Sequence, residues 1–158
     1  MEFRDGTIDG VLWLPLSIFH DDRGWLCELF RRDDVHPDHF PAMGYLSMTE
    51  AGVTRGPHEH LDQTDYFCFL GPSNFKIYLW DTRPQSPTYR VRQIEVVGID
   101  KPMTLIVPPG IVHAYKNIGS VPGLVVNCPN RLYKGPGRQD PVDEIRHENR
   151  GATEFRME

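Results

Sequence analysis

The amino-acid sequence predicts an all-β fold, an antiparallel sandwich or barrel, on three observations. Its 158 residues include 14 glycines and 14 prolines, so turn signals recur along the whole chain. Between these breaks lie short runs rich in β-branched and aromatic residues, which are typical of strands. Helical periodicity of useful length is almost absent. Many short strands separated by turns favour a closed or double-layered sheet, because closure hides the sheet edges.

The expected strands follow one another along the chain. The clearest are 66–70 (YFCFL), 75–80 (FKIYLW), 90–99 (RVRQIEVVGI), 104–108 (TLIVP) and 123–127 (GLVVN). In 75–80, Phe75, Ile77 and Leu79 are spaced two residues apart, so they share one face of a strand. At most a turn or two of helix is expected, near 30–37 (FRRDDVHP) and 143–148 (DEIRHE).

Length and composition set outer limits on the protein. The chain fits one domain, 1–158, with a single core. A net charge of −5 without a basic run argues against nucleic-acid partners. No apolar stretch approaches the roughly 20 residues needed to span a bilayer, and the polar start is unlike a secretory signal. Three cysteines at unrelated spacings, Cys27, Cys68 and Cys128, predict neither a disulfide framework nor a thiolate zinc site. The expected location is the cytoplasm.

Two histidines in the stretch 57–61 (PHEHL) raise the question of function. If this stretch is extended, His58 and His60 point the same way. A second stretch, 107–117 (VPPGIVHAYKN), carries His113 in the pattern P-x-G-x-x-H-x-x-x-N. The structural alternative is that these histidines are turn residues satisfied by hydrogen bonds. Taken together, the two stretches resemble the two signature motifs of the cupin superfamily. The resemblance implies a cupin-type double-stranded β-helix (jelly roll) barrel with its chemistry inside, and we expect His113 to enter the pocket from the sheet opposite His58 and His60.

A metal site is one possible use of these residues. Metal-binding cupins add a glutamate four or five residues after the second histidine, and here that window holds Thr64 and Asp65. Asp65 would complete a set with three histidines that suits Fe, Mn, Ni or Zn. The sequence leaves open whether His58, His60, Asp65 and His113 bind a divalent transition metal or none.

A narrower resemblance covers most of the chain. The stretches 9–31 (DGVLWLPLSIFHDDRGWLCELFR), 54–60 (TRGPHEH), 78–90 (YLWDTRPQSPTYR), 105–115 (LIVPPGIVHAY) and 130–137 (NRLYKGPG) occur in this order. They resemble the dTDP-4-dehydrorhamnose 3,5-epimerase family. That resemblance implies a jelly-roll homodimer that needs no metal or organic cofactor and acts on a nucleotide-linked 4-keto-6-deoxy sugar. It also implies that His58 is the general base, that Arg23 and Arg55 bind phosphate or sugar, that Glu28 contacts substrate, that His113 lies in the pocket, and that Tyr133 lies near the nucleotide base.

The chain also departs from the family pattern. Asn127 stands where the family has the tyrosine that returns a proton to the sugar from the opposite face, so we expect Asn127 only to bind substrate. The family's Q-x-N-x-S strand is replaced by 43–50 (MGYLSMTE), which keeps only Ser47. The C-terminal, aspartate-bearing helix of the family has no clear counterpart. His60 replaces the family's usual glutamine, and R-G-x-H-x-H is also similar to the dTDP-4-keto-6-deoxyglucose 3,4-ketoisomerases.

The sequence therefore predicts an isomerase or epimerase that abstracts a proton α to the ketone of a nucleotide-linked 4-keto-6-deoxy sugar, in surface polysaccharide or deoxysugar biosynthesis. One alternative is a metal-dependent oxygenase or isomerase, and another is a sugar-nucleotide-binding cupin without catalysis. Three clustered imidazoles cannot all be protonated cheaply. We expect His58 to stay neutral as the base, with Arg55 adding positive charge beside it, and His60 and His113 to assist.

Overall fold

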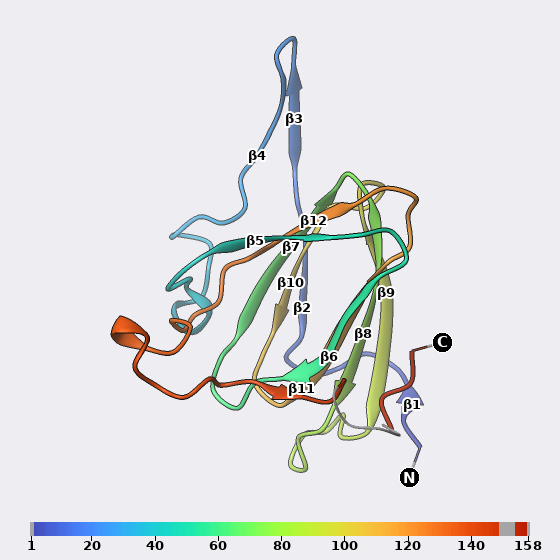
Figure 1. Ribbon diagram of the computed structural model, residues 1–158, viewed down its shortest axis with the longest axis vertical. Helices are drawn as coiled ribbons and strands as arrows, with labels where there is room; N and C mark the ends of the chain where they lie inside the picture. Colours follow the sequence, from blue (N-terminus) through green and yellow to red (C-terminus); the bar gives the residue numbers. More distant parts are fainter. Residues whose placement is uncertain (1, 149–153, 158) are drawn as a thin grey trace.

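The computed structural model describes residues 2–148 and 154–157. Its strands form two facing sheets and a separate hairpin (Figure 1). The first sheet has the order β1 (Arg4–Asp5), β9 (Val91–Gly98), β8 (Asn74–Asp81), β11 (Ile111–Asn117), β6 (Thr54–Glu59) and β13 (Ile145–Arg146). The second has the order β2 (Leu12–Pro15), β10 (Met103–Val107), β7 (Asp65–Gly71), β12 (Gly123–Asn127) and β5 (Tyr45–Thr49). The hairpin pairs β3 (Ile18–Asp21) with β4 (Gly24–Cys27).

All described pairings are antiparallel except that of β1 with β9. This all-β jelly roll confirms the expected fold class. Helix is limited, in the described residues, to two 3-10 turns, Pro37–His39 and Pro136–Arg138. None of the described helices is long and apolar enough to cross a membrane.

Period-two patterning explains how the two sheets pack. Phe75, Ile77 and Leu79 of β8 enter the main core between the sheets, as expected from the alternation. Tyr78 and Trp80 point to the outer face, where Phe155 from the C-terminal segment covers them. A strand whose alternate faces are both apolar is therefore buried on both sides.

The two expected helical turns had different outcomes. Near 30–37 the backbone turns, with the amides of Asp34 and Val35 both donating to the Arg31 carbonyl, and the first 3-10 turn follows. The expectation for 143–148 is wrong. Ile145 and Arg146 form β13, because they pair with the exposed edge of β6. Residues 149–153 of the C-terminal stretch lie outside the described residues.

The β3–β4 hairpin projects away from the barrel (Figure 1). Its large apolar side chains Phe19, Trp25 and Leu26 are each more than half exposed. Contiguous exposed apolar side chains of this kind commonly mark an interaction surface.

Candidate active site

The histidine cluster is built on the pairing of β6 with β11. His58 and His113 are direct partners across this ladder, and their ring centroids lie 4.3 Å apart. His60 is the first residue after β6, and its ring centroid lies 5.8 Å from that of His58. The shared pocket was expected, but the expectation that His113 comes from the opposite sheet is wrong. β6 and β11 are neighbours in one sheet, and the spacing of two motifs does not reveal which distant strands pair.

A bulge brings β6 close against β11. The register shifts between His113 and Tyr115, so β6 carries an extra residue between His58 and Arg55. Gly56 lies there with a φ of +85°, and a Cβ on it would lie 2.6 Å from the His113 carbonyl oxygen. Only glycine fits this conformation and this approach. The Arg-Gly of the motif therefore serves to seat His58 beside His113.

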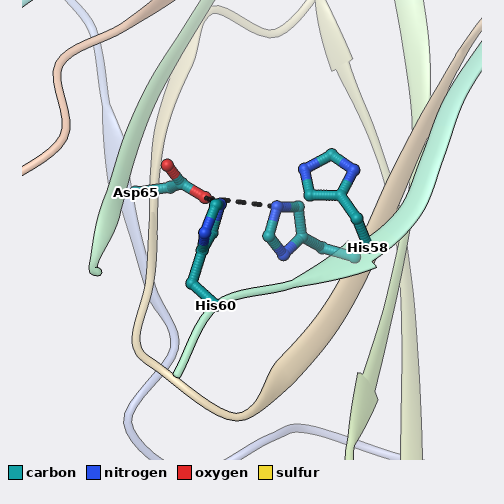
Figure 2. A group of neighbouring side chains, drawn as sticks. His58, His60 and Asp65 are labelled. Atoms are coloured by element: carbon teal, nitrogen blue, oxygen red, sulfur yellow. Dashed lines mark ion pairs between the residues drawn. The ribbon is translucent and has the colours of Figure 1, made fainter. Parts of the chain in front are cut away.

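The opposite sheet contributes Asp65, the first residue of β7, which is almost completely buried. Its Oδ2 lies 3.3 Å from His60 Nε2 and 3.2 Å from His113 Nε2. Figure 2 shows the side chains of His58, His60 and Asp65 turned toward one another inside the barrel. Oδ1 of Asp65 accepts hydrogen bonds of 2.8 Å from the side-chain amides of Gln63 and Asn127. A buried carboxylate is tolerated when it is paired and hydrogen-bonded in this way.

Backbone carbonyls fix the orientation of two imidazoles. His113 Nδ1 lies 3.0 Å from the Ile111 carbonyl oxygen, and His60 Nδ1 contacts the Asp143 carbonyl oxygen. With both Nδ1 atoms so engaged, both Nε2 atoms face Asp65. His113 Nε2 and Asp65 Oδ2 are buried and, despite their short separation, lack a hydrogen bond of good geometry. Such a cluster is stable either with protonated imidazole beside the carboxylate or with a cation among the ligand atoms.

The pKa values of the two motif histidines are pushed in opposite directions. Burial lowers the pKa of His58 to about 2, helped by positive charge at His113, His60 and Arg146, while Asp65 acts the other way. Burial also disfavours the charged form of His60, but the Asp65 carboxylate, 3.3 Å away, outweighs this and raises the pKa of His60 to about 9.

Asp65 keeps its negative charge, since its two imidazole neighbours lower its pKa more than burial raises it. The expected neutral state of His58 is thus confirmed in direction. Repulsion from the other histidines was expected, but burial is the larger cause, and the additional positive charge comes from Arg146 and not from Arg55. The Arg55 guanidinium is instead engaged with Thr49 Oγ1 at 2.9 Å and with the Met48 carbonyl oxygen at 2.7 Å.

The cluster opens into a cavity of about 1280 Å³ between the two sheets. His58 and His60 line it from the first sheet, and Tyr45 and Ser47 line it from the second. Its lining includes five basic side chains, those of Arg55, Arg131, Lys134, Arg138 and Arg146, and five acidic ones, those of Asp62, Asp140, Asp143, Glu144 and Glu148. A cavity of this size can hold a large organic ligand, and the arginines in its lining can bind an anionic group of that ligand.

The residues singled out from sequence lie in three places. Arg55, His58, His60 and Tyr133 line the cavity, and Tyr133 is more than half exposed on its rim. His113 and Asp65 are buried beneath it, as is Asn127, whose Nδ2 also donates to the Tyr45 hydroxyl at 3.0 Å.

Arg23 and Glu28 lie outside this cavity. The Arg23 side chain is 90% exposed at the hairpin turn and pairs with Asp21. The Glu28 carboxylate lies 3.7 Å from Arg31 and is also exposed. These two side chains do not reach the histidine cluster of their own chain.

Three side chains near the cluster were not anticipated. Tyr115 follows His113 by two residues and Tyr45 precedes Ser47 by two, so strand periodicity could have placed both inside the barrel. Asp143 had no such signal. Its carboxylate accepts backbone hydrogen bonds of 2.8, 2.9 and 2.8 Å from Leu61, Asp62 and Gln63, and so it holds the loop that carries His60 toward Asp65.

The chain is similar in sequence to two proteins of glycan or polysaccharide biosynthesis. The chain is 37% identical over 131 residues to the "Probable low-salt glycan biosynthesis epimerase Agl13" of Haloferax volcanii, covering 82% of this chain and 81% of that protein. It is 31% identical over 153 residues to the spore coat polysaccharide biosynthesis protein SpsL of Bacillus subtilis, covering 94% and 99%.

Among solved structures, the fold resembles that of ChmJ, a 3'-monoepimerase from Streptomyces bikiniensis in complex with dTDP-quinovose. The TM-score is 0.73 at 20% identity, over 90% of this chain and 72% of that one. Residues 5–135 match the family described as dTDP-4-dehydrorhamnose 3,5-epimerase. The chain therefore belongs to the dTDP-4-dehydrorhamnose 3,5-epimerase family.

Proposed function

We propose that this protein is a cytoplasmic epimerase or isomerase of a dTDP-linked 4-keto-6-deoxy sugar and that it acts in surface polysaccharide or deoxysugar biosynthesis. The observation that carries the proposal is a partly buried His58, whose pKa is lowered, at the wall of a large cavity with arginines in its lining. The family and the two polysaccharide-related relatives support the substrate class.

The proposed chemistry needs a neutral base next to an acidic carbon–hydrogen bond. A proton α to a ketone is acidified because the carbanion delocalises onto oxygen as an enolate. His58 takes this proton without first having to lose one, since its pKa is held low. The imidazolium that forms is stabilised by Asp65, which favours the charged form of His58, and by the enolate beside it.

The rim suits the nucleotide half of such a substrate. A diphosphate carries charge that guanidinium groups bind through paired N–H donors. Arg55, on β6, and Arg138, in the loop after β12, both line the cavity. Tyr133 presents an aromatic ring there on which a base can stack.

Hydrogen exchange tests the proposal directly. We expect the protein, incubated with dTDP-4-keto-6-deoxyglucose in deuterium oxide, to introduce deuterium at C3, at C5 or at both, as followed by NMR. The labelled carbon, or migration of the ketone, identifies the reaction. Tight binding of dTDP-sugars and UDP-sugars without any exchange would contradict the proposal and favour a non-catalytic binding protein.

We further propose that the active form is a homodimer in which the β3–β4 hairpin reaches the partner. Arg23 is expected to bind substrate, yet its side chain extends into solvent, away from its own cavity. The same hairpin exposes Phe19, Trp25 and Leu26, which a second copy would cover. A dimer of this kind explains both the exposed Arg23 and the exposed apolar side chains of the hairpin. Its two-fold axis makes each hairpin contact the other subunit in the same way.

Mixing two inactive variants tests this arrangement. Arg23→Ala removes the donated side chain, and His58→Asn removes the base. If Arg23 acts across the interface, each hybrid dimer has one intact site, and random mixing restores about a quarter of wild-type activity, because half the dimers are hybrids with one of two sites intact. No recovery after mixing, with hybrids verified by differential tagging, would place Arg23 outside the partner's site.

A metal-dependent enzyme is the second candidate, favoured by one specific observation. His113 Nε2 and Asp65 Oδ2 are buried without hydrogen-bond partners, and each ligand atom of His58, His60, Asp65 and His113 lies within 4.8 Å of the others. The Nδ1 contacts of His60 and His113 with carbonyl oxygens also match how metal-binding histidines are oriented. These four residues fit Zn, Fe, Mn or Ni, which would act as a Lewis acid on a bound oxygen.

Metal content and thermal stability decide between the candidates. If the metal proposal holds, untagged protein contains near-stoichiometric transition metal, and adding Zn²⁺, Ni²⁺ or Mn²⁺ to chelator-treated protein raises its melting temperature. Asp65→Asn is expected to remove the increase. Substoichiometric metal together with an unchanged melting temperature would reject this candidate.

A further inference from the structure

Tyr45 and Asn127 are direct partners across the β5–β12 ladder. Both side chains point into the barrel, because the Asn127 amide donates to the Tyr45 hydroxyl oxygen at 3.0 Å and to Asp65 Oδ1 at 2.8 Å. Asn127 is almost fully buried, and its own Oδ1 accepts from the Tyr66 backbone amide at 3.1 Å. The phenol is therefore connected, through one rigidly held amide, to the buried carboxylate of the histidine cluster.

Tyr45 and His58 belong to different sheets, and the sheet decides which face of a bound sugar each residue can reach. Both residues line the cavity, but β5 belongs to the five-stranded sheet and β6 to the six-stranded sheet. A sugar ring held between the sheets would present one face to His58 and the other to Tyr45.

The hydroxyl of Tyr45 has a proton to give. In the contact with Asn127 the amide is the donor, so the hydroxyl oxygen accepts and its own hydrogen is not used. No acceptor for that hydrogen is found among residues 2–148 and 154–157, and the side chain is about half exposed to the cavity. Burial raises the pKa of Tyr45 to about 12, so the phenol stays protonated at neutral pH.

Two other tyrosines line the cavity and fit the role less well. Tyr115 lies on β11, in the same sheet as His58, and its hydroxyl is engaged with Ser47 Oγ at 3.3 Å. Tyr133 lies on the outer loop with its side chain more than half exposed.

We propose that Tyr45 is the acid that returns a proton to the sugar carbon, on the face opposite the one from which His58 removes it. The proposal rests on the function proposed above. His58 takes the α proton, and the electron pair of that bond forms the enolate. The enolate carbon then takes the hydroxyl proton of Tyr45, the carbonyl re-forms, and a phenolate remains. The proton on His58 returns to the phenolate through water in the cavity, so no co-reactant is consumed.

This assignment gives Asn127 a different role from the substrate binding expected from the sequence. Asn127 stands where the family resemblance places the proton-donating tyrosine, and a phenol is supplied instead from the residue paired with it. Asn127 is then a positioning residue that holds the Tyr45 oxygen.

Tyr45→Phe separates the two proton transfers, because it removes only the hydroxyl. In deuterium oxide, with dTDP-4-keto-6-deoxyglucose, we expect the rate of forming inverted product to fall by at least about a hundredfold. Deuterium should still enter the unreacted substrate with retention, through His58, at a rate within about tenfold of wild type. Exchange and inversion thus become uncoupled, which a merely structural role would not produce.

Tyr115→Phe is the matched control, since it removes a cavity phenol from the sheet of His58. We expect it to keep the wild-type ratio of inversion to exchange. Unchanged inversion in Tyr45→Phe, or equal loss of exchange and inversion with dTDP binding and melting temperature intact, would overturn the role of Tyr45. Ketone migration without inversion in the wild-type protein would also overturn it. If wild-type protein shows neither exchange nor turnover, the proposed function fails and this inference fails with it.

Discussion

Replacing His58 with asparagine is expected to lower α-carbon exchange by about a thousandfold, within the range that a general base contributes. Asparagine is of similar size and forms hydrogen bonds, but it has no basic lone pair at neutral pH. Binding of dTDP should stay within about tenfold, or roughly 1.4 kcal/mol, because the arginines that would hold the diphosphate are unchanged. Deuterium incorporation by NMR and calorimetric titration of dTDP measure the two effects.

His60→Asn is the informative comparison, since both histidines lie in one motif. His60 is protonated at neutral pH because of Asp65, so it cannot remove a proton, and we expect slower but detectable exchange in this variant. Indispensable His60 together with replaceable His58 would contradict the assignment of the base. The 3,4-ketoisomerase or metal-dependent alternative would then be favoured.

The second large effect concerns stability and its pH dependence. Asp65→Asn is expected to lower the free energy of unfolding at pH 6.5 by about 3 kcal/mol, since it breaks a buried ion pair. This is a substantial fraction of the 5–15 kcal/mol typical of a domain. Asn keeps the size of the side chain but cannot balance the charge on His60. Asp62→Asn is the control, because Asp62 is an exposed carboxylate paired with Arg131, and its loss should change stability little.

The pH dependence follows from the two pKa shifts of the pair. The pKa of Asp65 is lowered, so its contribution is present above about 3.8 and is lost as the pH falls. The pKa of His60 is raised to about 9, so its contribution is complete below about 6.5 and is lost between pH 6.5 and 9. Wild-type stability should therefore decline over that alkaline window, by up to about 1.4 kcal/mol per pH unit from this group.

In Asp65→Asn the alkaline decline should largely disappear, because the group that raises the pKa of His60 is gone. Denaturant unfolding at several pH values between 6.5 and 9 measures the slope in both proteins. Identical slopes would show that Asp65 does not hold the proton on His60. The acid side is less informative, since unfolding there is also favoured by protonation of His58, whose pKa is low only in the folded chain.

The sequence by itself determined the strands and the inward-facing side chains. Alternation in 75–80 placed Phe75, Ile77 and Leu79 in the core, and the two-residue spacing of His58 and His60 put both in one pocket. These features depend on neighbouring residues, because side-chain direction and backbone conformation are set within a few residues along the chain.

Only the tertiary structure decided which distant residues meet. It paired His113 with His58 in one sheet, set Asp65 against His113 and His60 from the other sheet, and joined Tyr45 to Asn127 across β5 and β12. It also made a strand of Ile145–Arg146, where local pattern had indicated a turn, and turned Arg23 away from its own cavity. Strand pairing and sheet packing are set by burial summed over the whole barrel. No local pattern records that sum, so the strand that pairs with the one carrying His58 was beyond prediction from the chain alone.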